Sequence, residues 1–432
     1  MPELDTGNNA WILISAALVL LMTPGLALFY GGLSRASSVI NMMMKCLVAI
    51  GLVSVVWVLV GESIAIGDGG GNPFFSMDVS SAFGLRYVTE LGMVDGGVSA
   101  GAMSAFGMMF AIITVALIAG AVADRMKFTA WVVFSTAWVV LVYAPVAYWV
   151  WGGGWIEELG VLDFAGGTAV HANAGAAALG LALVVGRRIG WKDGNFAPHN
   201  LPLVVIGTGL LWFGWFGFNA GSAFVSDAIA GLALLNTQVA TAAAILAWLL
   251  IDRIRGIKPS VLGACSGVIA GLVAITPAAG YVTPLGAIAI GAVAGILCPF
   301  AIGLKHKLGY DDSLDVVGLH MVAGIWGSIA VGLFAFGDVT GGTNGVFYGG
   351  EFSFLGYQTL AVLAVVAYSF VVALIIGLIL KVTIGVRISE EEELAGIDAA
   401  QHGEAGYDLP VNGNTGTGLP ETNADTAEKI NA

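Results

Sequence analysis

The stretch "DFAGGTAVHANAG", residues 163–175, places a single histidine, His171, near the start of an apolar run that continues to residue 186. An apolar segment of about 20 residues can cross the roughly 30 Å hydrocarbon layer of a membrane as a helix. Ionisable side chains are costly inside such a helix and usually mark a path for ions or protons. The stretch therefore predicts a membrane-spanning helix over 166–186 that carries a histidine.

The rest of the chain has the same character. Of its 432 residues, 58% are hydrophobic and 10% are charged, and its mean hydropathy is +0.90. This composition predicts an all-α polytopic membrane protein. Eleven apolar segments are long enough to span a membrane, and they cover residues 9–32, 42–66, 100–122, 129–151, 166–186, 201–219, 233–251, 260–276, 284–304, 315–336 and 355–381.

The positive charges predict the orientation of these helices. Fifteen of the sixteen Lys and Arg residues follow odd-numbered segments, and only Arg86 follows an even-numbered one. Positive residues in short loops are retained on the cytoplasmic side. We therefore expect the N-terminus outside and the C-terminus inside.

The chain is predicted to have two parts, a membrane domain over 1–387 and a cytoplasmic tail over 388–432. The tail contains ten acids and one lysine, so it carries −9 of the total net charge of −13. It starts with helix-forming residues and ends in a polar segment rich in Gly, Asn and Thr, whose end we expect to be disordered.

A second histidine suggests an internal repeat. "HANAG" at 171–175 and "HMVAG" at 320–324 share the pattern H-x-x-A-G, five segments apart, and an aspartate precedes each, Asp163 and Asp315. If the first ten helices form two inverted halves of five, with one extra helix, His171 and His320 are equivalent and can meet near the midplane. A lone histidine would more simply bridge two helices, but a pair can hold a small polar molecule or pass a proton.

Other polar and aromatic residues allow two interpretations. Asp163 is placed to cap the helix that follows it, or to assist at the mouth of a cation path. Aromatic residues at the outer ends of segments either bind a cation with their faces or form the usual interfacial belt. They are Phe106, Phe110, Trp149, Trp151, Trp155, Trp212, Trp215 and Phe218, and Ser222 follows them as a hydroxyl acceptor. Cys46, Cys265 and Cys298 show no metal-ligand or redox spacing and are read as small buried hydrophobic residues.

Taken together, these residues resemble the ammonium transporter family, the Amt/Mep/Rh proteins, and specifically its prokaryotic Amt branch. The matching stretches run through nearly the whole chain. They are "TPGLALFYGGLSR", "LIAGAVADRMKF", "WGGGW", "DFAGGTAVHANAG", "PHNLPLVVIGTGLLWFGWFGFNAGS", "KPSVLGACSGVIAGLVAITPAAGYV" and "DVVGLHMVAGIWG".

The resemblance implies a homotrimer in the plasma (inner) membrane, with one pore per subunit. It implies that Phe110, Trp151 and Ser222 recruit ammonium beside Asp163, and that Phe110 and Phe218 obstruct the pore. It also implies that His171, His320 and Trp215 line the pore, where ammonium loses its proton. The substrates implied are ammonium and ammonia, with methylammonium as a further candidate.

The resemblance also implies a regulatory role for "EEEELAGIDAAQHGEAGYDL" in the tail and a PII-type signalling protein as a cytoplasmic partner. One position departs from the family: Glu62 in "VGESIAIGDGG" stands where an aromatic residue is common. It either adds a carboxylate to the outer vestibule or pairs locally at a subunit neighbour.

Two other functions remain open, an ammonium sensor that signals through the tail and a neutral ammonia channel of the Rh type. An enzyme is not expected, because the chain shows no phosphate-cradling glycine motif, no metal-ligand spacing and no nucleophile with an evident base. We expect no cofactor, no metal and no nucleic-acid partner. Membrane lipids are the expected surroundings.

Overall fold

The computed structural model describes residues 3–407 except 68, 78–82, 90–91 and 194–195. The predicted disordered end of the tail lies outside these residues. The long helices are α1 (Thr6–Leu33), α2 (Val39–Val56), α5 (Ala100–Ile118), α6 (Phe128–Trp138), α7 (Ala144–Trp151), α9 (Asn173–Val185), α10 (Leu201–Gly221), α11 (Ala228–Ile254), α12 (Val261–Ile275), α13 (Pro284–Leu308), α14 (Val322–Phe334) and α16 (Phe352–Thr383).

Shorter elements connect or extend them. The short helices are α3 (Glu62–Ala65), α4 (Arg86–Thr89), α8 (Trp155–Glu158), α15 (Gly337–Thr340), α17 (Glu390–Ala395) and α18 (Ile397–His402). Four π-helical segments, Trp57–Gly61, Val139–Tyr143, Gly167–Ala172 and Val317–Met321, run directly into α3, α7, α9 and α14. Two short strands, β1 (Met93–Val94) and β2 (Val98–Ser99), pair antiparallel with Met93 opposite Ser99.

A helix is present at each of the eleven predicted segments. In the described part of the chain, ten helices are long and apolar enough to span a membrane. The remaining predicted segment, 260–276, forms α12, which is apolar but has only 15 residues. The multi-pass helical architecture is confirmed, whereas the count of eleven crossings and their direction remain predictions.

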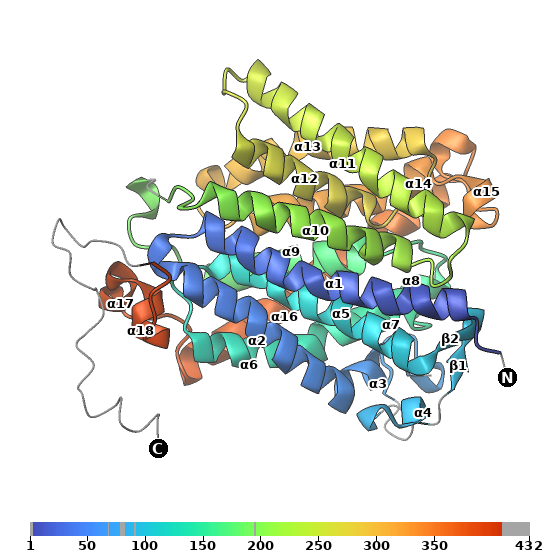
Figure 1. The fold of residues 1–432 in the computed structure, drawn as a ribbon, viewed down its shortest axis with the longest axis horizontal. Helices are drawn as coiled ribbons and strands as arrows, with labels where there is room; N and C mark the ends of the chain where they lie inside the picture. The colour runs from blue at the N-terminus through green and yellow to red at the C-terminus, as the bar shows by residue number, and fades with distance from the viewer. Residues whose placement is uncertain (1–2, 68, 78–82, 90–91, 194–195, 408–432) are drawn as a thin grey trace.

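The long helices lie side by side in a bundle (Figure 1). The helix α1 packs along α10, α11 packs against α12 and α13, and α16 packs along α9. Glycines allow this close approach: a Cβ added to Gly207 of α10 would lie 2.3 Å from the backbone nitrogen of Phe29 in α1. Small residues at helix contacts are the usual means by which membrane helices pack. The three cysteines are buried, as predicted.

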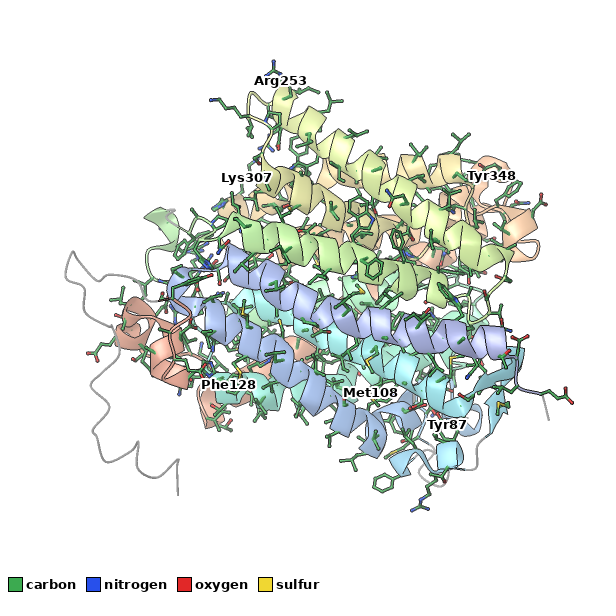
Figure 2. All side chains as sticks on the ribbon, viewed as in Figure 1. Tyr87, Met108, Phe128, Arg253, Lys307 and Tyr348 are labelled. Carbon is green, nitrogen blue, oxygen red and sulfur yellow. The ribbon has the colours of Figure 1, made fainter. Side chains whose placement is uncertain are left out.

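The two ends of the bundle differ. Figure 2 shows Arg253 and Lys307 toward the end that carries α17 and α18, and Tyr87 and Tyr348 toward the opposite end. We call the end with α17 and α18 the basic end. It is the end that the positive charges predict to be cytoplasmic.

Candidate functional site

The two histidines lie next to each other in the interior of the bundle. The Nδ1 atoms of His171 and His320 are 3.4 Å apart, and their ring centroids are separated by 5.5 Å with planes inclined by 24°. The residues are 1% and 3% exposed. The prediction that these histidines meet is therefore confirmed.

Both histidines occupy π-helical turns. His171 lies in Gly167–Ala172 and His320 in Val317–Met321. A π-turn inserts an extra residue into the hydrogen-bonded ring and is frequent at functional sites. No sequence pattern distinguished these turns from ordinary helix.

A buried aspartate lies eight residues before each histidine. The carboxylate of Asp163 accepts hydrogen bonds from the backbone amides of the segment start, Gly166, Gly167, Thr168 and Ala169, at 2.7–3.1 Å. The carboxylate of Asp312 accepts from Val316 and Val317 at 3.1 and 2.7 Å. Both therefore cap the free amides at a helix start.

This assignment corrects the sequence prediction, which paired Asp315 with Asp163. Asp315 forms an ion pair with Lys305 at 2.5 Å, and it is Asp312 that caps the helix of His320. Both capping residues stand eight positions before a histidine, whereas Asp315 stands five positions before His320.

The glycines of the two H-x-x-A-G motifs make the histidine pair possible. A Cβ on Gly175 would lie 2.4 Å from the backbone nitrogen of Met321, next to His320. A Cβ on Gly324 would lie 2.7 Å from the nitrogen of Ala172 and 3.1 Å from the Cβ of His171. Each glycine thus faces the histidine segment of the other half, so the two helices cross at backbone contact.

An aromatic column leads to the histidines. The ring centroids of Phe106 and Phe110 are 4.8 Å apart, and Phe110 stacks on Phe218 at 4.1 Å. Phe218 lies 5.9 Å from the His171 ring, and Trp215 stacks on His171 at 5.2 Å. The structure therefore brings these predicted residues into one continuous set.

Trp151 and Ser222 lie beside this column. The Trp151 ring meets Phe110 edge-on at 6.3 Å, and its indole N–H donates to the backbone oxygen of Asp163 at 2.8 Å. The Ser222 hydroxyl donates to the backbone oxygen of Phe218 at 2.8 Å. All three residues named for recruitment are thus connected to the phenylalanine stack.

Three other tryptophans do not join the column. The indole of Trp149 donates to the backbone oxygen of Phe74, and Trp155 packs on the Phe74 ring. Trp212 is only partly buried and packs against the apolar core. Trp149 and Trp155 therefore pack against the 72–75 loop and not against the column.

Two contacts near the histidines were not expected. The Trp215 indole donates to the Thr276 hydroxyl at 2.9 Å, which orients the ring against His171. The Thr168 hydroxyl donates to Ser328 at 2.8 Å and so links the two histidine helices. Only the positions of these residues within apolar helices could have drawn attention to them.

Glu62 is not an open vestibule carboxylate. It is 2% exposed and accepts hydrogen bonds from the hydroxyls of Tyr87 and Ser104. These partners belong to the same chain, on α4 and α5. In the part of the chain that the structure describes, no group of three or more His, Cys, Asp or Glu side chains is placed to hold a metal ion.

One nitrogen of the pair is left for another molecule. His171 uses Nδ1 toward His320, while its Nε2 is buried and has no partner among the described residues. A neutral imidazole can donate at one nitrogen and accept at the other. The site can therefore hydrogen-bond a small polar molecule in otherwise apolar surroundings.

The chain is similar to known proteins along nearly its whole length. A model of the Ammonium Transporter Family matches residues 10–407. The chain is 52% identical to an ammonium transporter of Mycobacterium tuberculosis (strain H37Rv) over 94% of its length and 91% of that protein, and 48% identical to one of Aquifex aeolicus over 94% and 95%. Among solved structures, it resembles a Sensor Amt Protein (31% identity, TM-score 0.85, 92% and 98% covered) and Candida albicans Mep2 (38%, 0.84, 98% and 95%).

Proposed function

Because the chain belongs to the ammonium transporter family, whose members are transporters and not enzymes, we propose that it strips ammonium of a proton and conducts ammonia through the histidine-lined channel. The proton follows by the same path or a coupled one. The observation that carries this proposal is the buried histidine pair at the foot of an aromatic column.

Recruitment takes place at the outer end of the column. Phe110 and Trp151 present ring faces and edges, and the Ser222 hydroxyl accepts an N–H bond from the ion. Each cation–aromatic contact contributes about 0.5–2 kcal/mol, depending on how far it is desolvated. The Asp163 carboxylate is occupied by four amides, so it anchors the histidine helix rather than touching the ion, and the backbone oxygen of the same residue orients Trp151.

Burial affects that carboxylate as well. Desolvation raises the pKa of Asp163, although the four amide donors act in the opposite sense. A carboxylate that accepts four N–H bonds at a helix start is a structural anchor.

The stacked Phe110 and Phe218 rings then close the path. With 4.1 Å between their centroids, no hydrated ion passes unless the rings move. Transfer of a bare cation into apolar surroundings costs many kcal/mol, whereas neutral ammonia does not carry this penalty. A potassium ion cannot lose a proton to become neutral, so the same barrier excludes it.

Below the rings, the histidines provide the polar contacts. The unpartnered Nε2 of His171 bonds ammonia, and the 3.4 Å contact between the two Nδ1 atoms allows a proton to be relayed from one ring to the other. Trp215 supplies an apolar wall.

We extend the proposal to the whole assembly. It comprises eleven crossings with the N-terminus outside, two inverted halves of five helices, a membrane domain over 1–387, a regulatory tail and a homotrimer in the plasma membrane. The reciprocal packing of each histidine segment on the helix of the other half supports the inverted halves. Methylammonium as a second substrate and a PII-type protein as a partner belong to the same proposal.

A sensor is the second candidate. One of the similar solved structures is named a Sensor Amt Protein, and the tail of this chain contacts three loops at the basic end. If the tail is the output, ammonium binding should change its contacts without net flux.

The test is charge movement in proteoliposomes after an ammonium jump, with lumen pH recorded in parallel. The parent is compared with His171→Leu plus His320→Leu and with Met321→Leu, a control of similar volume next to His320. A current that is lost only in the histidine variant supports the proposal, and a current retained there overturns the role of the histidines. Lumen alkalinisation without current indicates a neutral ammonia channel, and no transport at all favours the sensor.

A further inference from the structure

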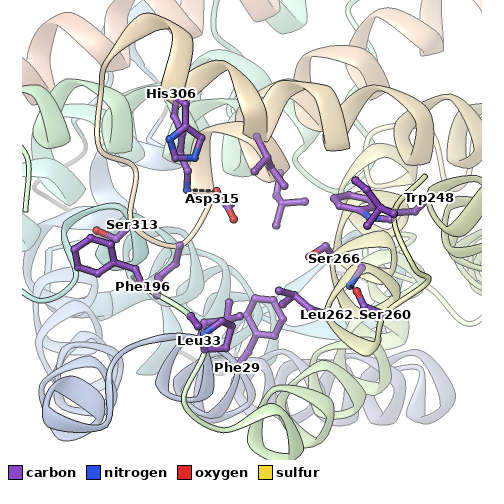
Figure 3. A pocket seen from close by; sticks show the side chains of 18 of the residues that line it. Phe29, Leu33, Phe196, Trp248, Ser260, Leu262, Ser266, His306, Ser313 and Asp315 are labelled. Carbon is purple, nitrogen blue, oxygen red and sulfur yellow. Dashed lines mark hydrogen bonds and ion pairs between the residues drawn. The ribbon is translucent and has the colours of Figure 1, made fainter. Parts of the chain in front are cut away.

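A cavity of about 480 Å³ opens at the basic end of the bundle (Figure 3). Its walls come from α1, the loop before α10, the adjoining ends of α11 and α12 with the turn between them, α13 and the segment that precedes α14. Leu319, the neighbour of His320, is part of the lining. The cavity therefore borders the helical segment that carries His320.

Two carboxylates line this cavity, and they differ in their partners. Asp315 is paired with Lys305. Asp252, in the last turn of α11, is 6% exposed, and the described chain provides its carboxylate with no hydrogen bond or ion pair. A buried carboxylate without a partner is unfavourable unless a cation or a donor reaches it.

The cations nearest in sequence do not neutralise it. Arg255 extends over the ring of Phe300 at 5.1 Å, and Arg253 points outward at the tip of the bundle. On the far wall, Arg188 is bound to Asp311 and Asp124. Among the described residues, the carboxylate of Asp252 thus has no ion-pair partner on the wall of the cavity.

Polar atoms from three residues surround one point beside Asp252. A Cβ placed on Gly263 would lie 2.8 Å from Asp252 Oδ2, 3.1 Å from Trp248 Nε1 and 3.2 Å from Ser260 Oγ. Gly263 is not one of the glycines with positive φ, so its backbone does not require glycine. The three side chains therefore converge on Gly263, whose lack of a side chain leaves the Asp252 carboxylate and the Ser260 hydroxyl unobstructed on that side.

We propose that Asp252, Ser260 and Trp248 form an inner binding site for the ammonium ion, in the cavity into which the channel opens. The carboxylate and hydroxyl oxygens accept N–H bonds, the carboxylate neutralises the charge, and the Trp248 indole closes one side. The proposal rests on the proposed function. Ammonia leaving the histidines takes up a proton, either the conducted one or one from the solution, and the ammonium ion that forms is held here before release.

A monovalent N–H donor fits this site better than a metal ion. Calcium takes six to eight oxygen ligands and magnesium an octahedral set, whereas this wall of the cavity offers one carboxylate and one hydroxyl. An ammonium ion needs only a few acceptors, and water in the cavity can supply the rest.

The test uses the sidedness of the site. Ammonium is applied to either face of proteoliposomes whose orientation is determined by protease access to the tail, and half-saturation of the current is measured on each face. Asp252→Asn removes the charge at constant size, Asp252→Glu keeps the charge, and Gly263→Ala places a methyl group against the Asp252 carboxylate. Asp338→Asn, an exposed aspartate at the opposite end, is the control.

For Asp252→Asn we expect the half-saturating concentration to rise about tenfold or more from the basic-end face, as the loss of one charge-assisted contact implies. It should be unchanged from the other face. Gly263→Ala should raise the half-saturating concentration on the same face as Asp252→Asn does, and Asp252→Glu should keep it near the value of the parent. Equal shifts on both faces, or no shift, would overturn the inner site, whereas a parent without current on either face overturns the proposed function itself.

Discussion

At the scale of single residues, the site depends on two aspartates that touch no substrate. Asp163 and Asp312 each bind the free amides at the start of a histidine segment. Charge-assisted hydrogen bonds of this type are stronger than neutral ones. The two side chains therefore determine where each π-helical turn begins, and so where each imidazole lies.

Two substitutions of Asp163 should show how much its carboxylate contributes to stability and to transport. Asp163→Asn keeps one acceptor oxygen and should lose about 1–3 kcal/mol of stability with transport reduced, whereas Asp163→Ala leaves four buried amides unpaired and should abolish transport. Thermal unfolding in detergent and ammonium flux measure the two effects. Unchanged flux in Asp163→Ala would contradict the anchoring role.

At the scale of elements, the crossing of the two histidine helices depends on a glycine from each. Gly175 in α9 faces Met321, and Gly324 in α14 faces Ala172. The backbones are so close that a methyl group has no space.

We expect Gly175→Ala and Gly324→Ala to separate the helices, lengthen the contact between His171 and His320 and reduce ammonium current at least tenfold. Gly356→Ala in α16 is the control, because a Cβ there meets nothing within 4 Å. That change should preserve the current and add about 0.5–1 kcal/mol of helix stability. A normal current in both pore variants would show that the spacing is not limiting.

The tail is the second element with a defined contact. The Asp398 carboxylate accepts from the amides of Ile40 and Asn41 at the start of α2, at 3.0 and 2.8 Å. His402 bonds Asn41 at 2.9 Å, and Tyr407 bonds His199 at 3.0 Å. The tail thus closes the N-terminus of α2 and reaches the loop before α10.

This contact should respond to pH. Burial and then the positive charge of Lys45 lower the pKa of His402 below its usual 6.5. The free tail therefore binds more protons than the docked tail in this range, so docking weakens as pH falls through about 6.5. Burial raises the pKa of Asp398. Protonation of that carboxylate therefore favours docking as the pH falls, in a more acidic range than the effect of His402.

Protease cleavage within residues 388–407 should accordingly be faster at about pH 6 than at about pH 8. His402→Gln should remove most of this difference. Equal cleavage rates in the parent at both pH values would contradict the prediction.

At the scale of the whole molecule, a buried ionic cluster joins the loops of the basic end. Arg188 binds Asp311 at 2.8 Å and Asp124 at 3.1 Å, and Arg35 lies 3.5 Å from Asp124. Burial alone would raise the pKa of Asp311, but the hydrogen bonds from Arg188 and the charges of Arg125 and Arg188 outweigh it and hold the pKa below its usual value. The cluster connects segments from both halves of the chain.

Asp311→Asn should destabilise the protein by about 3–5 kcal/mol, because it leaves the buried Arg188 guanidinium only partly compensated. In the parent, the stabilisation that ionised Asp311 provides is fully present above its unfolded pKa of about 3.8. It is lost as the pH falls through the lower pKa of the folded state. Unfolding temperature in detergent, compared with Asp338→Asn, measures the effect. A shift no larger than that of the exposed control would contradict it.

Much of this architecture is predictable from local composition. Apolar length alone predicted a helix at each of its eleven segments, and ten of them match helices long and apolar enough to span a membrane in the described part of the chain. The signal is strong because lipid requires each crossing to satisfy its own backbone. The pattern H-x-x-A-G also identified the two histidines as partners. Both signals are local and need no knowledge of the packing.

Other features are decided only where distant segments meet. The π-turns, the capping by Asp312 instead of Asp315, the hydrogen bond of Trp215 to Thr276 and the burial of Glu62 between Tyr87 and Ser104 all depend on contacts across the bundle. The unpaired carboxylate of Asp252 belongs to this group, since its lack of a partner is a property of its neighbours. By itself the sequence determined a polytopic helical membrane protein with a histidine in each half, because hydrophobicity and spacing are written along the chain. The tertiary structure decided the 3.4 Å contact and the cavity below it, because these follow from how closely two glycine-bearing helices can cross.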